Sequence, residues 1–199
     1  TQRRGSSYQA RSKGLGKGVQ VMSQVVLPEI YVERVVSEAV RELRHRVLWQ
    51  HKESSEACVI DIDDAEHAIH LAAFTKNQFS WGIRLHGHPG TLVGACSLFD
   101  QHCMRVQVPW GPGDDLRLRV MGTLPEARRW GAGAALIARA VQEVQKQGRH
   151  ALWCDARQVA YGFYERQGFA FLNDTYEIPD IGPHRTMALD LSSRPVSNL

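Results

Sequence analysis

The sequence has few cysteines and no long apolar run. Cys58, Cys96, Cys103 and Cys154 have no metal-type spacing, so we expect small buried residues rather than metal ligands. The adjacent His102 and Cys103 have no further ligands beside them, which favours a loop or surface over a metal centre. No apolar run approaches the length of a membrane span, and no signal-peptide core precedes the first predicted strand. These absences predict a soluble, cytoplasmic protein without a membrane partner.

Acidic residues are absent from positions 1–24. This segment combines basic residues with many Gly, Ser and Gln residues, a composition typical of a disordered tail. It accounts for the formal charge of +3, because the rest of the chain is slightly acidic, and nucleic-acid binding by the body is therefore not expected. A nucleic-acid arm and a transit segment are alternatives, but we favour residues upstream of a start at Met22. One domain is predicted over residues 25–199.

Residues 116–146 predict a strand, a loop and a helix. Leu116, Leu118 and Val120 alternate with basic residues, which indicates a strand with one buried face. Apolar residues then recur at helical spacing over 136–144, and Gly148 is expected as a left-handed cap at the end of the helix. The loop between the two elements is the most specific feature of the chain.

This loop, RRWGAG at 128–133, has the chemistry of a phosphate site. Amides in the first turn of a helix lack intrahelical partners and lie at the positive end of its dipole. Glycine at 131 and 133 leaves no Cβ to hold a phosphate off the backbone, and Arg128 and Arg129 could add charged hydrogen bonds. The alternative is a helix start with small residues for close packing. A dinucleotide fingerprint is disfavoured because Leu136 replaces its third glycine, and a triphosphate P-loop lacks its Gly-Lys-Ser/Thr ending.

Two motifs resemble those of the GNAT superfamily of N-acetyltransferases. Arg128-x-x-Gly131-x-Gly133 resembles the Arg/Gln-x-x-Gly-x-Gly/Ala element that cradles the pyrophosphate of coenzyme A. The run AYGFYERQGF at 160–169 resembles the family's Ala-x-x-Phe-Tyr-x-x-x-Gly-Phe, and PHRTM at 183–187 resembles the ElaA-like branch. The resemblance covers about residues 29–190. It implies an α/β fold whose mixed, mostly antiparallel sheet is flanked by helices and has splayed central strands.

The resemblance also implies a reaction, the direct transfer of an acetyl group from acetyl-CoA to a primary amine of a small molecule, without a metal. Alternatives are a protein lysine or N-terminal acetyltransferase, a CoA-binding module without catalysis, and a nucleic-acid-associated protein acting through residues 1–24. A homodimer stays open. The residues implied in cofactor binding are Met121 and Thr123, beside the pantetheine arm, and Arg128, Arg129, Gly131, Ala132, Gly133 and Ala134, around the pyrophosphate.

Tyr164 matches the tyrosine that points its hydroxyl at the CoA sulfur in many GNAT enzymes. It would stabilise the leaving thiolate, and its alternative role is that of a core residue in an aromatic cluster. Asp115, Asp155 and His184 are each admissible as the base that deprotonates the amine, as is a chain of waters. We rank His184 first because imidazole titrates near neutral pH and because it is expected to open the last strand.

The rest of the chain supplies the expected frame. Ser37 is a natural N-cap for a helix after a strand at 30–36, and Gly122 could mark a bulge that splays the central strand. Asp114 and Asp115, in the turn before that strand, are candidate substrate contacts. The polar segment 50–66 is interpreted as a solvated linker or, alternatively, as an acidic rim that attracts an amine through Asp61, Asp63, Asp64 and Glu66. Further strands are expected at 68–74, 92–99, 151–155, 169–172 and 186–190, with a short helix around 159–164.

Overall fold

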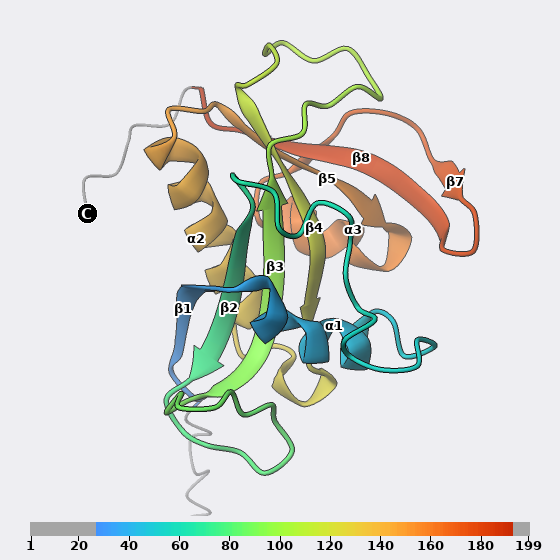
Figure 1. Ribbon diagram of the computed structural model, residues 1–199. Helices are drawn as coiled ribbons and strands as arrows, with labels where there is room; N and C mark the ends of the chain where they lie inside the picture. Colours follow the sequence, from blue (N-terminus) through green and yellow to red (C-terminus); the bar gives the residue numbers. More distant parts are fainter. Residues whose placement is uncertain (1–26, 193–199) are drawn as a thin grey trace, which may run out of the picture.

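A computed structural model describes residues 27–192, so the basic segment 1–24 lies outside the described part of the chain. The described strands form one mixed sheet in the order β1-β2-β3-β4-β5-β8-β6, with β7 paired to β8 (Figure 1). Every pair is antiparallel except β4 with β5, as the resemblance implied. The strands are β1 Ile30–Val35, β2 Ile69–Thr75, β3 Thr91–Phe99, β4 Asp115–Thr123, β5 Ala151–Arg157, β6 Ala170–Phe171, β7 Tyr176–Ile178 and β8 Gly182–Asp190.

Helices cover both faces of this sheet. The helices are α1 Arg41–Val47, α2 Ala132–Lys146 and α3 Tyr161–Arg166, with short 3-10 turns at Ser37–Val40, Pro125–Ala127 and Gln158–Ala160. Gly94 on β3 lies against Leu136 of α2, whereas Gly122, which pairs with the next residue of β3, lies against Val47 of α1. Because neighbouring residues of a strand point to opposite faces, α1 and α2 lie on opposite sides of the sheet.

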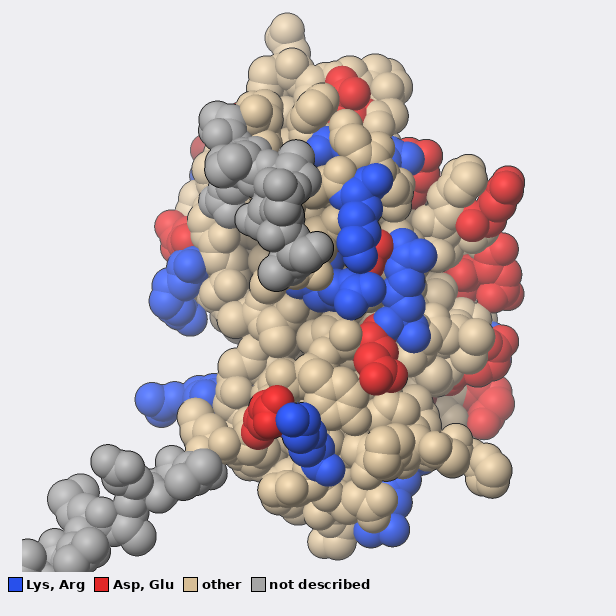
Figure 2. Space-filling model, turned by 90° about the vertical axis from the view of Figure 1, so that its left-hand side faces the viewer, with Lys and Arg blue, Asp and Glu red and all other residues tan. Residues whose placement is uncertain are grey.

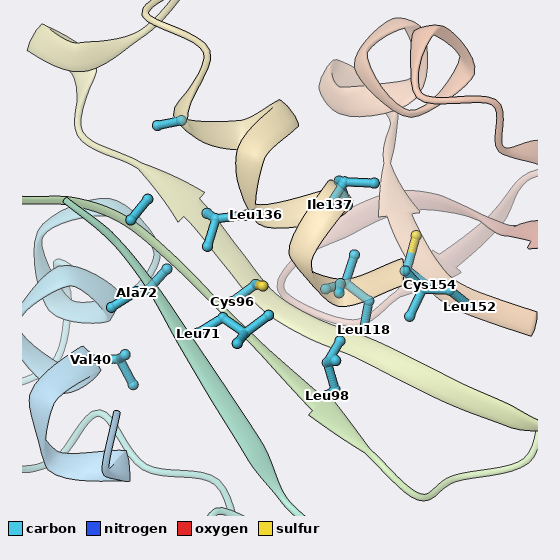
Figure 3. Packing of buried hydrophobic residues seen from close by; sticks show 14 of the residues in the cluster. Val40, Leu71, Ala72, Cys96, Leu98, Leu118, Leu136, Ile137, Leu152 and Cys154 are labelled. Atoms are coloured by element: carbon cyan, nitrogen blue, oxygen red, sulfur yellow. The ribbon is translucent and has the colours of Figure 1, made fainter. Parts of the chain in front are cut away.

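The core fills both faces of the sheet: Val40 and Leu43 beside or in α1 belong to it, as does the apolar stripe of α2. The predicted stripe of α2 is confirmed, because Leu136, Ile137, Ala140 and Val144 are all at most 3% exposed. Figure 3 shows Leu136 and Ile137 among side chains from β2, β3, β4 and β5. All four cysteines are buried and unpaired, as predicted. Gly148 ends α2 with φ +66°, and the amide after it bonds to the carbonyl of Val144 at 3.1 Å, so the predicted cap is confirmed.

A buried carboxylate joins α2 to the edge strand. Glu143 accepts hydrogen bonds from Arg34 on β1 at 2.6 Å and from Arg139 at 2.7 Å, and Lys146 lies 4.0 Å away. Burial raises the pKa of Glu143, but these cations outweigh burial and the net pKa is lowered. Basic side chains gather over the middle of the face seen in Figure 2, and an acidic side chain lies among them.

The central strands separate after a short parallel ladder. β4 pairs with β5 only over residues 115–117 and 151–153, although both strands continue beyond it. β4 also has a bulge, because the register with β3 shifts between Ala95 and Ser97 and Val120 has φ +46°. The predicted splay is therefore confirmed, with the bulge just before Gly122 rather than at it.

Three sequence expectations need correction. Ser37 is not an N-cap: Val36 has that place, and the Ser37 hydroxyl instead donates to Asp64 at 2.9 Å. The last strand begins at Gly182, earlier than expected, because its outer part pairs with β7, a three-residue strand too short to show a pattern. Asp63 is neither a linker nor a rim residue: it is 4% exposed and forms a bidentate ion pair with the fully buried Arg44, at 2.5 and 2.8 Å.

Candidate active site

A cleft of about 430 Å³ opens where β4 and β5 separate. The bulged end of β4 forms one wall, and β5, α3 and the β7–β8 hairpin form the other. Of the residues predicted for a functional site, the cleft brings together Met121, Thr123, Arg128, Asp155, Tyr164 and His184. Side chains that are far apart in the sequence therefore meet at the gap between the central strands.

The predicted phosphate loop, which starts at Arg128, leads into α2 at Ala132. Gly131 is the N-cap residue, has φ +92°, and makes no side-chain cap hydrogen bond. A Cβ built on it would meet nothing within 4 Å, so space is open at this backbone. Arg128 and Arg129 are exposed, and the amides of Ala132 and the next two residues precede the first intrahelical bond, from Ala135 to Gly131 at 2.9 Å. Open space, free first-turn amides and two cations suit an anion.

Gly133 has a different structural role from the one expected. Its Cβ would lie 3.0 Å from Cε2 and 3.1 Å from Cζ of Phe163, a contact too close for ordinary packing. The missing side chain therefore makes room for α3 against α2, which is the close-packing alternative. We expected the missing side chain of Gly133 to leave space for a phosphate. The ring of Phe163 occupies that space instead.

Tyr164 packs in an aromatic cluster and also belongs to the lining of the cleft. It is 8% exposed, and its ring packs edge-on against Phe163 and Phe169 at centroid distances of 5.2 Å. The residue also lines the cleft, and its hydroxyl donates to Sδ of Met121, another lining residue, at 3.7 Å. Burial raises the pKa of Tyr164 well above 10, so the phenol stays protonated and is a proton donor.

His184 lies on β8 and is 4% exposed. Its Nδ1 lies 2.7 Å from the carbonyl oxygen of Gly182. A carbonyl only accepts, so Nδ1 carries the proton of the neutral ring and Nε2 has a free lone pair. The ring is therefore held in the tautomer that can accept a proton at Nε2. It is the third residue of its strand rather than the first, because β7 extends the pairing outward.

Asp155 is a fixed anion of the cleft. One oxygen accepts from Tyr176 at 2.5 Å and from Arg105 at 3.2 Å, and the other accepts from Arg117 at 2.5 Å. Burial raises its pKa, but the Tyr176 hydrogen bond and the two arginines outweigh burial, so the net pKa is lowered. Burial and Asp155 in turn raise the pKa of Tyr176 to about 12. A carboxylate so occupied is a poor base.

Asp115 does not contact the cleft and is wrong as a candidate substrate contact. It is completely buried at the start of β4, at the other end of the strand from the bulge. It accepts hydrogen bonds from the Cys103 amide at 2.9 Å, from Trp110 at 3.1 Å, and contacts His102 at 2.9 Å. Asp114 accepts from the Gly111 amide at 2.9 Å and closes the preceding turn. These side chains fix the loop at 100–114, so their role is structural.

Cys154 lines the cleft but is not an activated nucleophile. Burial, followed by the charge of Asp155, raises the pKa of its thiol, so it stays protonated. Over residues 27–192, no cluster of three or more His, Cys, Asp or Glu residues is arranged to hold a metal ion. In the same range no helix combines the length and apolar character needed to cross a membrane.

The cleft also contains residues that the sequence analysis missed. Trp49 follows α1, and Ile178 and Ile181 come from the β7–β8 hairpin. Arg119 had been noted only as part of the polar face of its strand, and Arg157 lies beyond the predicted end of β5. Arg119 could have been predicted, because it is an arginine on the strand that precedes the phosphate loop. The other four residues, Trp49, Arg157, Ile178 and Ile181, reach the cleft only through the tertiary fold.

Comparison with known proteins agrees with this geometry. Residues 35–169 match the family model described as the acetyltransferase (GNAT) family. The chain is 33% identical over 156 residues to a Bacillus subtilis (strain 168) protein named uncharacterized N-acetyltransferase YitI, covering 78% of this chain and 93% of the relative.

Solved structures at 14 to 17% identity share the fold. Escherichia coli ElaA superposes with a TM-score of 0.57 over 80% of this chain and 99% of its own. The Escherichia coli ribosomal-protein-S18-alanine N-acetyltransferase gives 0.57 at 17% identity, over 86% and 99%. An aminoglycoside 6'-N-acetyltransferase complexed with coenzyme A gives 0.56 at 15% identity, over 82% and 98%. The match to the family model and the YitI relative together establish that this chain belongs to the GNAT family and is an acetyl-CoA-dependent acetyltransferase.

Proposed function

We propose that the protein transfers an acetyl group from acetyl-CoA to a primary amine of a small molecule by direct attack on the thioester. The observation that carries the proposal is the single cleft in which the bulged β4 backbone, Arg128, Tyr164 and His184 meet. An anion site, an extended backbone edge, a proton donor and a proton acceptor are the parts this reaction requires.

The cofactor would lie along one continuous path. Pairing between β4 and β5 ends at Arg117, so the backbone of Met121 and Thr123 has no β5 partner and can pair with an extended pantetheine arm. The path then reaches the start of α2, where Gly131 leaves the backbone open. The phosphates would be held by Arg128 and Arg129 and by the amides of Gly131, Ala132, Gly133 and Ala134.

Acetyl-CoA supplies the activated thioester, and the side chains of the cleft would manage the protons. His184 would receive a proton from the amine at Nε2, because Nδ1 is occupied by the carbonyl of Gly182. The amine nitrogen forms a bond to the acetyl carbon as the bond from that carbon to sulfur breaks. Tyr164, kept protonated by burial, would donate to the departing thiolate. The protonated Cys154 thiol favours this direct route over an acetylated cysteine.

The size of the cleft favours a small acceptor. The cleft has a volume of about 430 Å³, at the lower end of the range of small-molecule sites, roughly 300 to 1,000 Å³, and the acceptor must share this space with the reactive end of acetyl-CoA. Trp49 after α1 and Ile178 and Ile181 of the β7–β8 hairpin add apolar groups to the lining. A protein lysine or N-terminus is the alternative acceptor. The solved structures of the same fold include an enzyme named for each kind of acceptor.

A screen tests the proposal. The full chain is incubated with acetyl-CoA and, in parallel, with primary amines of small molecules and with peptides that offer a lysine or a free N-terminus, and thiol release is measured. Transfer to small amines with at least about tenfold higher kcat/KM than to any peptide is expected. Faster transfer to peptides would overturn the choice of acceptor. CoA binding by calorimetry without any thiol release would instead indicate a CoA-binding module.

A further inference from the structure

One arginine of the cleft is left unused by the proposed cofactor site and by the ion pairs around it. Arg119 lies two residues after Arg117 on β4, so the two side chains leave the strand on the same face. Arg117 donates to Asp155 and stacks on the ring of Trp153 at 4.7 Å. No hydrogen bond or ion pair with residues 27–192 engages the guanidinium of Arg119, and the neighbouring charges act on it only at longer range. It is a half-buried cation without a counter-ion in the described part of the chain.

The charges that surround Arg119 do not balance it. The groups that act on it are Arg117, Asp155, Asp63 and Arg44. Both carboxylates already have other partners: Asp155 pairs with Arg117, and Asp63 pairs with the buried Arg44. Burial, followed by the charge of Arg117, lowers the pKa of Arg119. Arginine nevertheless stays protonated in proteins, so the cleft keeps an unneutralised positive charge.

The whole cleft has the same imbalance. Its lining contains one carboxylate, Asp155, against four guanidinium groups. Such a lining would repel an acceptor whose only charged group is an ammonium, whereas it would attract an acceptor that carries a negative charge. Arg128 is assigned to the phosphates by the proposed function, and Arg157 is exposed at the rim. The guanidinium groups belong to Arg117, Arg119, Arg128 and Arg157.

We propose that the acceptor amine also carries a carboxylate, and that Arg119 binds this carboxylate inside the cleft. The planar guanidinium presents paired N–H donors whose spacing matches the two oxygens of a carboxylate. Binding would supply the counter-ion that Arg119 lacks and would leave the amine of the same molecule to face His184. This inference rests on the proposed acetyl transfer and narrows its substrate class to amino acids in the broad sense.

Matched acceptors test the inference. Amino acids and their primary amides share an amine and a side chain but differ in the negative charge, and kcat/KM for each is measured by thiol release with parent, Arg119→Gln and Arg166→Gln enzymes. Arg119→Gln should lower kcat/KM for the acids at least about 30-fold, the usual loss on removing one partner of a desolvated charge pair, and change that for the amides less than about threefold. Arg166→Gln, at the exposed end of α3 and outside the cleft lining, should change both series less than about threefold.

Two readouts separate substrate recognition from a structural role. Arg119→Gln should keep the KM for acetyl-CoA and the melting temperature, and Arg119→Lys, which keeps the charge but loses the paired donors, should fall between parent and Gln. Equal losses for acids and amides, or a parent enzyme that acetylates amides as well as acids, would overturn the inference while the acetyl transfer stands. No thiol release with either series, nor with the broader amine and peptide screen, would overturn both.

Discussion

Replacement of Tyr164 by Phe removes one hydroxyl and tests the assigned proton donor. In the folded protein the hydroxyl donates to the thioether of Met121, at 3.7 Å, and also contacts the thiol of Cys154, and both sulfur atoms are weak acceptors. The ring contacts with Phe163 and Phe169 are kept. The free energy of unfolding should therefore change by less than about 1 kcal/mol. Because the variant should stay folded, a fall in its turnover would report on the reaction rather than on the stability of the fold.

The expected fall in turnover is at least about tenfold, or about 1.4 kcal/mol of lost transition-state stabilisation, because a positioned proton donor typically contributes about 10² to 10⁴-fold. Turnover is measured as thiol release at saturating acetyl-CoA, with single-turnover kinetics to establish that chemistry limits the rate. Acetyl-CoA affinity, measured by calorimetry, should be unchanged.

Tyr161→Phe is the matched control, because it lies on the same helix and its buried hydroxyl has no partner among the described residues. Its removal should leave turnover unchanged and stability equal or slightly higher. If Tyr164→Phe turned over as fast as the parent, with chemistry rate-limiting, the reasoning would be refuted and Tyr164 would be a core residue alone.

Three other substitutions test separate parts of the fold and site. Gly131→Asp and Gly131→Asn both tolerate the left-handed conformation, so both should fold with a similar loss of about 1 to 2 kcal/mol, but only Asp should weaken CoA binding strongly in calorimetry, by tenfold or more relative to Asn. Equal CoA affinities would contradict the phosphate assignment. Gly133→Ala should cost about 1 to 3 kcal/mol in urea unfolding, because its Cβ would press on Phe163, and a neutral effect would show that α3 yields easily. Asp63→Asn leaves Arg44 buried and unpaired and should cost about 3 to 5 kcal/mol at pH 7. Burial raises the pKa of Asp63, but the bonds from Arg44 and the Ile60 amide outweigh it and the net pKa is lowered. The contribution of this carboxylate is therefore complete above about pH 4 and lost as pH falls through its folded pKa, so the parent and Asn curves of stability against pH should converge in acid. Curves that stay parallel would contradict this linkage.

The sequence was sufficient where the signal was local. The α2 stripe follows from periodicity and the cap at Gly148 from one residue's conformational needs, while the cysteines were expected to be buried because they lack metal-type spacing. The structure confirms all three, together with the strands other than β7. The two motifs identified the family, which the comparisons confirm. The roles of the site residues, the small-molecule acceptor, the cytoplasmic location and the homodimer stay predictions, and the character of residues 1–24 lies outside the described chain.

The failures have a common physical cause, because the partner of a polar side chain is set by tertiary contacts. Asp63 resembles its acidic neighbours in the sequence, but Arg44, 19 residues earlier, buries it. Asp115 resembles a loop carboxylate, but three donors from the loop at 100–114 surround it. Gly133 fits the phosphate motif, yet the ring that requires its missing Cβ comes from Phe163, on another helix.

The short parallel ladder between β4 and β5 divides the sheet into two antiparallel halves. Strands β1 to β4 form one antiparallel unit and β5 to β8 the other. The ladder between the two units has three residue pairs, and the amides of His150 and Ala151 extend it with hydrogen bonds to the carbonyl of Asp114 at 2.7 and 3.1 Å. This seam should open more easily than either half, so amides on both sides of it should exchange hydrogen with solvent faster than those between β2 and β3. A ligand that pairs with the unpaired edges would bridge the halves, and slower exchange along β4 and β5 would be the sign that it had become part of the sheet.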